Sequence, residues 1–371
     1  MNRSKINNKP KIWQHKKIYI PTSLLIFNLL ILINISKAKA QPSIAFAGID
    51  TLVDKAIDLL YHKKYFDAID ICENVITTYP ENPMGYLGQA AVYHIIMLTY
   101  RINLFDTEFD SLTSLAIDIG EKAINRYEDD ANTYFVLGAA YGFRGLHRIR
   151  KGEWFGAFRD GLRGVSNLKK AHEKDETLYD VYYGLGLYYY WKSVKAKVLT
   201  FLRLMKDERD KGIEYLKIAN EKGRFSSMEA LFALIEIYYY EDRYEEALDQ
   251  CLSLDDKFSK DPSWNYLTAK VLDKLSRWEE AKHYFLTLLT LLQESQFKSN
   301  SYLAECHYSL AKCSFELKDY ETARNELNLA SELSKLWDKE KEMEGPLLDF
   351  DKVLARIKSL DEELSKLDFN E

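Results

Sequence analysis

The apolar residues of this chain fall at helical spacing, and one short pattern recurs among them. An aromatic residue is followed three positions later by alanine at Tyr65/Ala68, Tyr244/Ala247, Trp278/Ala281 and Tyr320/Ala323. The second and third of these pairs are 34 residues apart, and in both an arginine precedes the aromatic residue and two glutamates follow it. A fixed period of this length predicts a stacked array of helix–turn–helix units.

The middle of the chain keeps a longer period. Six landmark positions recur at steps of 48 residues, at Tyr86/Tyr134/Tyr182, Ala90/Gly138/Gly186, Tyr93/Tyr141/Tyr189, Ala116/Gly164/Gly212, Gly120/Leu168/Leu216 and Ala123/Ala171/Ala219. Each of these three units therefore has fourteen more residues than a 34-residue unit. We expect the additional residues to form long first helices, or an extra helical turn and loop, at Ile96–Asp110 and Ser193–Glu208.

These landmarks resemble the tetratricopeptide repeat family, in which alanine lies where the second helix crosses the first and the aromatic residue fills the corner of the turn. The pairs Leu137-Gly138 and Leu185-Gly186, each followed by a tyrosine three residues later, agree with that family. The resemblance implies an all-α fold, a right-handed α-solenoid over 51–337. We expect about seven units, at 51–82, 83–130, 131–178, 179–227, 228–261, 262–295 and 303–337. An amphipathic helix at 347–368 would cap the apolar face of the last unit, because terminal units of a solenoid lack a neighbour.

The central 48-residue block also resembles eukaryotic tetratricopeptide repeat protein 39 and the inclusion-body clearance proteins. The residues that carry this second resemblance are Gly138, Arg144-Gly145 and the run from Gly184 to Trp191. It implies no role for any single residue.

The first forty residues have the pattern of a secretory signal peptide. Eight basic residues and no acidic one occur in 1–40, and nineteen uncharged residues run from Ile18 to Ser36. The sequence Ala38-Lys39-Ala40 then gives the small-x-small pattern of a cleavage site. The alternative is an uncleaved membrane anchor, since the uncharged run just reaches the ~18 residues of a spanning helix. Either interpretation predicts that the rest of the protein is extracytoplasmic, as in a bacterial-type periplasm.

Charge is distributed unevenly along the chain. The formal net charge is -6, which divides into +8 for 1–40, −9 for 41–141, +8 for 142–206 and −13 for 207–371. The acidic total argues against a general nucleic-acid binder, whose affinity depends on positive charge. The positive segment at 142–206 coincides with the longer third and fourth units, which makes it the first place to look for a partner.

The four cysteines, Cys72, Cys251, Cys306 and Cys313, are predicted to be buried free thiols. Cys306 and Cys313 are seven residues apart in one predicted helix, so their Cα atoms would be about 10 Å apart. A disulfide needs Cα atoms within ~7 Å of each other.

No catalytic or metal-binding motif is found in the sequence. It contains no H-E-x-x-H pair, no C-x-x-C pair, no G-x-x-x-x-G-K-[ST] phosphate loop and no G-x-S-x-G elbow. Acidic pairs such as Glu279-Glu280 fall at predicted helix starts, where negative charge complements the helix dipole. We therefore expect a protein that is not an enzyme and that has neither a cofactor nor a metal site.

The resemblance implies that the first helices line a concave groove, at the second, fifth, ninth, twelfth and thirteenth positions of each unit. The partner-binding residues predicted in and beside this groove are Phe143, Arg144, Arg148, Tyr183, Tyr190, Trp191, Tyr239 and Tyr240. Tyrosine and tryptophan suit peptide binding, and two arginines one turn apart suit a carboxylate. The structural alternative is that the long helices bury the aromatic residues, while the basic side chains are solvated or pair with acidic neighbouring units.

Two functions remain open at this point. The first is a non-enzymatic scaffold of the cell envelope whose basic, aromatic groove binds an acidic or C-terminal segment of another protein. The second is attachment to the envelope surface through the basic amphipathic stretch at 191–205, which contains Lys192, Lys195, Lys197 and Arg203.

Overall fold

A computed structural model describes residues 48–368, apart from 127–129, 196–205 and 254. The signal segment predicted at 1–40 lies outside the described residues. Helices joined by short turns account for the part of the chain that is described, which contains no β-strand beyond one isolated bridge between Ile102 and Glu342. Among these helices, none combines the length and the apolar character that a membrane span requires.

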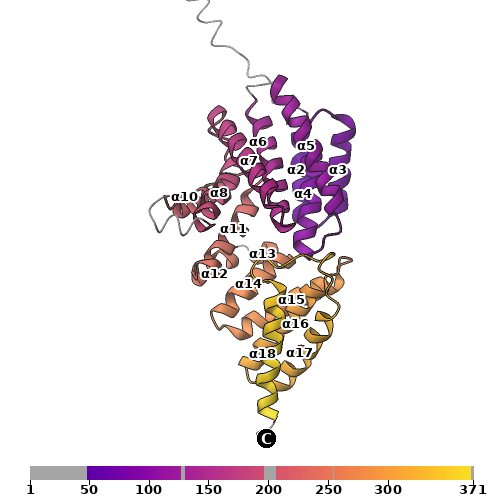
Figure 1. The fold of residues 1–371 in the computed structure, drawn as a ribbon, viewed down its shortest axis with the longest axis vertical. Coiled ribbons are helices and arrows are strands. Elements are labelled where there is room, and N and C mark those ends of the chain that lie inside the picture. The colour runs from indigo at the N-terminus through magenta and orange to yellow at the C-terminus, as the bar shows by residue number, and fades with distance from the viewer. Residues whose placement is uncertain (1–47, 127–129, 196–205, 254, 369–371) are drawn as a thin grey trace, which may run out of the picture. The chain divides into compact units, whose positions relative to one another are not determined.

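The helices follow one another as packed pairs, one pair for each predicted unit (Figure 1). Their bounds are α2 Asp50–Tyr61 and α3 Tyr65–Thr78; α4 Pro83–Tyr100 and α5 Asp106–Arg126; α6 Ala131–Arg150 and α7 Trp154–Lys174; α8 Val181–Lys195 and α10 Arg209–Lys222; α11 Ser227–Tyr240 and α12 Tyr244–Leu252, followed by the short α13 Asp255–Phe258; α14 Pro262–Lys274 and α15 Trp278–Glu294; and α16 Asn300–Glu316 and α17 Tyr320–Ser334.

The turn inside a unit has the same backbone in five of these pairs. A residue with positive φ follows the first helix, at Lys63, Gly152, Asp242, Ser276 and Lys318. The next amide donates back to the first helix, as from Lys64 N to the Leu59 carbonyl at 2.9 Å, which is the Schellman pattern. The aromatic landmark then begins the second helix. In the third unit the positive φ falls on glycine, and Trp154 takes the aromatic position.

The additional residues of the longer units are shared between both helices. Helix α6 continues from Gly138 to Arg150, whereas α11 continues only from the equivalent Ile235 to Tyr240. Helix α7 likewise begins well before Gly164, whereas α12 begins just before Ala247. The predicted lengthening of the first helix thus accounts for half of the additional residues, because the second helix is longer by a similar number of residues. Most of the expected Ser193–Glu208 insertion lies outside the described residues.

Small landmark residues mark the points where the two helices of a unit come closest. A Cβ atom added to Gly212 would lie 2.7 Å from the Tyr190 amide nitrogen and 2.8 Å from the Gly186 carbonyl oxygen. Backbone atoms cannot move away as a flexible side chain can, so the 48-residue step preserves glycine or alanine at these crossings.

The first two units also contact the last three. The isolated bridge at Ile102 is formed with the segment between α17 and α18, and the Met343 amide donates to the Arg101 carbonyl at 2.9 Å. Lys63, in the turn after α2, forms an ion pair with Asp261 at the start of α14. Phe297 packs against Tyr100, with ring centroids 5.1 Å apart. These contacts join parts of the array that are distant in the sequence.

Helix α18, Phe350–Asp368, lies against α16 and α17 at the end of the array (Figure 1). The side chains that it buries there are Val353, Ile357, Leu360 and Leu364. The same helix thus gives the last pair an apolar neighbour, as a terminal cap does.

All four cysteines are buried free thiols, as predicted. Burial raises the pKa of the Cys72 thiol to about 12, so it is not poised to react as a thiolate.

Candidate protein-binding surface

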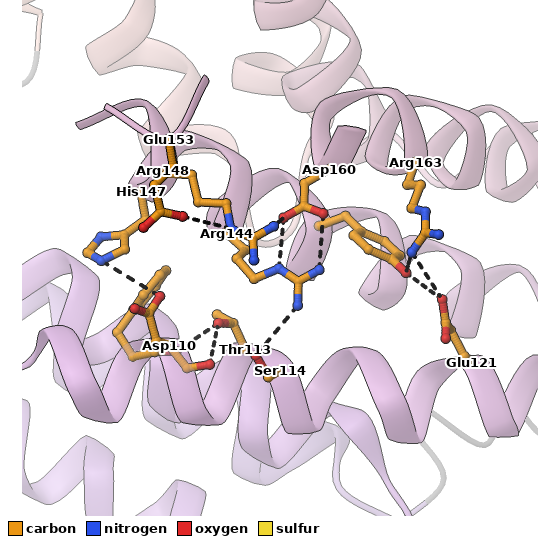
Figure 2. A network of polar contacts seen from close by, with 12 residues as sticks. Asp110, Thr113, Ser114, Glu121, Arg144, His147, Arg148, Glu153, Asp160 and Arg163 are labelled. Atoms are coloured by element: carbon orange, nitrogen blue, oxygen red, sulfur yellow. Dashed lines mark hydrogen bonds and ion pairs between the residues drawn. The ribbon is translucent and has the colours of Figure 1, made fainter. Parts of the chain in front are cut away.

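The two arginines predicted to bind a partner's carboxylate already hold one from their own chain (Figure 2). Asp160, fully buried on α7, accepts hydrogen bonds from Arg144 Nε at 2.8 Å and Nη2 at 3.0 Å. The same carboxylate is paired with Arg148 Nη1. Arg148 also lies 3.5 Å from Glu153. The arginines therefore fasten the extended parts of α6 and α7 together, and Asp160 occupies their donors.

Other basic side chains of the positive segment pair with α5 of the preceding unit. Lys151 Nζ lies 3.0 Å from Asp110 Oδ2, and His147 Nε2 lies 3.4 Å from Asp106 Oδ1. Burial lowers the pKa of His147, although the two aspartates oppose that change. Farther along, the Tyr141 hydroxyl donates to Glu121 and accepts from Arg163 at 2.9 Å (Figure 2). Much of the positive charge of 142–206 is therefore neutralised between helices.

Four of the predicted aromatic residues meet where α8 and α11 pack. Trp191 is half-buried, with its ring centroid 5.2 Å from that of Tyr190 and 5.8 Å from that of Tyr240. Tyr190 is almost completely buried, and Tyr239 packs against Tyr244 at 5.6 Å. Tyr240 remains 46% exposed, and its hydroxyl donates to the Pro346 carbonyl. Within this cluster Tyr240 is thus the most accessible side chain, Trp191 and Tyr239 are half-buried, and Tyr190 is out of a partner's reach.

The remaining two aromatic residues lie elsewhere. Phe143 packs edge-on against His94, with centroids 5.4 Å apart, and so belongs to the contact between α4 and α6. Tyr183 is half-buried on α8, and its surroundings include the charges of Arg150, Glu229 and Glu236. The structure therefore places Tyr183 among the charged groups described next, whereas Phe143, which is also half-buried, packs against α4.

Helix α2 covers one part of the first-helix face. Arg224, between α10 and α11, pairs with Asp50 at 3.0 Å and with Asp54 at 2.8 Å. Tyr61 packs against Phe258 at 6.4 Å, and its pKa is raised by burial and by the charge of Glu229. The beginning of α11 therefore faces the protein's own first unit.

The other part of this face is open. Leu146 and Ile149 are 40% and 44% exposed at the end of α6, and Arg150 beside them is also exposed. Desolvation by the surrounding helices lowers the pKa of Arg150 to about 10, and the charges of Glu236 and Tyr183 oppose this. We call the group formed by Leu146, Ile149, Arg150, Tyr183, Trp191, Glu236 and Tyr240 the open first-helix surface.

The sequence interpretation missed the charged members of this surface. Glu236 occupies the ninth position of the fifth unit, a groove position at which only aromatic residues were considered. Burial raises the pKa of Glu236 to about 7, and the charge of Arg150 opposes the rise. Applying the groove positions to charged residues as well would have identified it.

The similarity of this chain to known proteins is found among solved structures. No protein-family model matches the chain, and no curated protein matches it. Among solved structures, the APC/C hetero-tetramer Cut9-Hcn1 aligns with a TM-score of 0.50 at 17% sequence identity, over 78% of this chain and 48% of that chain. This chain thus spans about half the length of that relative. Several of the structures that match are described as TPR, or tetratricopeptide repeat, proteins.

The fold is a tetratricopeptide repeat solenoid. This confirms the predicted all-α architecture. A thermophilic TPR protein from Thermus thermophilus aligns over 60% of this chain and 98% of its own chain, with 20% identity and a TM-score of 0.40. The C-terminal part of a TPR repeat-containing protein from Cytophaga hutchinsonii aligns over 77% of this chain and 97% of its own chain, with 17% identity and a TM-score of 0.40.

Two other features bear on what the solenoid can do. In the described part of the chain, no group of three or more histidine, cysteine or acidic side chains is arranged to hold a metal ion. The alternative attachment stretch at 191–205 lies mostly outside the described residues, and only its beginning, to Lys195, belongs to α8. There Lys192 pairs with Glu208 at 2.8 Å.

Proposed function

We propose that this protein is a non-enzymatic, extracytoplasmic scaffold whose open first-helix surface binds a segment of another protein. The observation that carries the proposal is the group of accessible apolar side chains on adjacent first helices. Leu146, Ile149 and Tyr240 are each at least 40% exposed, and Tyr240 is braced edge-on by Trp191. Exposed apolar groups that are held in place and surrounded by charge are typical of protein-binding sites.

The charges of this surface favour a segment that presents a carboxylate, from an acidic side chain or a C-terminus. Arg150 is exposed, and within the described residues no carboxylate lies within 4.0 Å of it. Its planar guanidinium can bind a carboxylate through two parallel hydrogen bonds. Arg144 and Arg148 cannot do the same while Asp160 holds them. We therefore assign to Arg150 the contact with a partner's carboxylate that the sequence predicts for Arg144 and Arg148.

A cross-linking experiment tests the binding surface. A photo-reactive amino acid replaces Tyr240, or replaces Lys358 on α18 as a control position, and the cross-linked partner is identified from the native cells. We expect a product from position 240 that is reduced about tenfold by Trp191→Ala or Arg150→Glu. Circular dichroism of each variant checks that the helices remain intact.

Two results would contradict this function. One is an equal yield of the same product from positions 240 and 358, and the other is a yield from position 240 that neither variant changes. The proposed compartment is tested separately, by sequencing the N-terminus of the protein from the envelope fraction. A mature chain that begins at Gln41 supports export with cleavage, and recovery of Met1 in that fraction contradicts cleavage.

A further inference from the structure

The first two turns of α7 carry an exposed apolar stripe. Trp154, Phe158 and Leu162 follow one another at intervals of four residues, and they are 64%, 69% and 46% exposed. Phe155 beside them is 96% exposed. Large aromatic side chains this accessible, gathered on one helix, mark a surface that is buried in some state of the protein. We call these four residues the α7 face.

The 48-residue period shows what kind of contact this position makes. Trp154, Phe158 and Leu162 are the equivalents, one unit later, of Asp106, Asp110 and Ser114 on α5. All three of those side chains face α6. Asp106 lies 3.4 Å from His147, and Asp110 lies 3.0 Å from Lys151. Ser114 lies 3.5 Å from Arg144 (Figure 2). In the preceding unit the same positions are therefore a docking face for a helix.

The α7 face is also continuous with an existing contact between helices. Farther along the same side of α7, His172 is hydrogen-bonded to Tyr182 at 3.3 Å, and Lys169 lies over the ring of Tyr189 at 5.9 Å. Helix α8 thus packs on the second half of this stripe. In the described part of the chain, the first half remains exposed.

The charge around the α7 face indicates which kind of helix can bind there. Residues 144–170 contain eight basic and two acidic side chains, but Arg144, Arg148 and Lys151 are already paired with Asp160 and Asp110. Arg159, one helical turn after Phe155 on α7, is exposed and forms no ion pair with any described residue. A second copy of this chain would bring the same positive charges against themselves, which is unfavourable.

We propose that the α7 face binds an amphipathic helix of a partner protein, with an apolar stripe for Trp154, Phe158 and Leu162 and acidic residues beside that stripe. Packing an apolar helix face into such a site is a recurring mode of recognition. This site is made from the second helix of a unit, so it is separate from the open first-helix surface and does not depend on the function proposed for that surface.

A binding measurement with defined probes tests the site. One fluorescent helical peptide carries leucines along one face with glutamates on both sides, and a second has the same leucines with lysines instead. The full chain is compared with the Phe155→Ser/Phe158→Ser variant and with Leu329→Ser, which removes a side chain that is 48% exposed on α17. Vesicles of phosphatidylcholine with phosphatidylglycerol form a third arm.

We expect the acidic peptide to bind the wild-type chain at least about tenfold more tightly than the basic peptide, and the double variant to lose about tenfold in affinity. Leu329→Ser should leave the affinity unchanged. Failure of the acidic peptide to bind, or binding that the double variant does not weaken, would overturn the proposal. Vesicle binding that the double variant abolishes, without peptide binding, would also overturn it and would assign the α7 face to a lipid surface.

Discussion

Arg101 and Glu305 are 204 residues apart in the sequence, and Arg101 Nη1 lies 2.6 Å from Glu305 Oε2 in the interior of the protein. The guanidinium carbon of Arg101 lies 3.6 Å from the ring centroid of Tyr302 and 4.3 Å from that of Tyr266. Burial by itself would raise the pKa of Glu305, but the charges of Arg101 and Lys270 lower it to about 2. The carboxylate therefore stays ionised and joins the end of α4 to α16.

Replacing Arg101 with methionine should lower the free energy of unfolding by about 3 to 5 kcal/mol, because it leaves Glu305 buried with only Lys270 to offset its charge. Urea denaturation measures the change. Arg277→Met is the matched control, since Arg277 pairs with Glu280 on an exposed helix surface at 2.6 Å. That variant should lose less than about 1 kcal/mol. Equal losses in the two variants would contradict a special role for the buried pair.

Asp160→Asn should destabilise the protein by about 3 kcal/mol or more, because Arg144 and Arg148 then share a site from which the buried counter-charge is gone and only the exposed Glu153 remains near Arg148. Thermal or urea denaturation measures this. Glu153→Gln removes the exposed partner of Arg148, whose carboxylate is 52% exposed, and should cost less than about 1 kcal/mol. If Asp160→Asn proved as mild as Glu153→Gln, the interpretation that Asp160 fastens the extended helices would be wrong.

Glu236 should make stability depend on pH. Its pKa is raised from 4.5 to about 7 by burial, so between these values the folded state holds a proton that the unfolded state has lost. The free energy of unfolding then decreases as pH rises through this window. At pH 8, Glu236→Gln should be more stable than wild type by about 1 to 2 kcal/mol, and at pH 4 the two should be equal.

Denaturation at the two pH values checks this expectation, with Glu214→Gln on the exposed side of α10 as the control. A gain for Glu236→Gln that is the same at pH 4 and pH 8 would show that the effect does not come from ionisation.

Gly212→Ala should cost about 1 to 3 kcal/mol, because the new methyl group would meet backbone atoms of α8. Gly161→Ala in α7 is the opposite case, since an added Cβ there meets nothing within 4 Å. That substitution should stabilise the protein by about 0.5 to 1 kcal/mol, because alanine favours a helix. Melting temperatures of the two variants should therefore move in opposite directions.

The sequence predicted the helix pairs well because the residues that define them are local. Ala247 and Gly212 repeat at fixed steps since each unit needs a small residue at the same crossing. The division of the fourteen additional residues between two helices was not predictable from the landmarks alone. The landmarks would have the same spacing whether the additional residues lengthened one helix or both.

The candidate site was harder to predict, because pairing between helices decides which charges are free. Arg144 and Arg148 looked available in the sequence, and nothing near them indicates that Asp160 on the next helix turns inward to meet both. Arg150 lies just beyond the same pair and stays exposed. Contacts such as that of Arg101 with Glu305 leave no local pattern at all, since they depend on how the whole array curves.

The contacts of the first two units with the last three change how this array should come apart. In an open solenoid each terminal unit has a single neighbour, so the ends fray first and unfolding spreads inward. Here Lys63 with Asp261 and Arg101 with Glu305 give the early units a second set of neighbours. Unfolding of one end of the array should therefore destabilise the other end, and the whole array should unfold in one cooperative transition. Insertion or deletion of a single repeat would misalign these partners. This array should therefore tolerate a change in the number of repeats less well than an open repeat protein does.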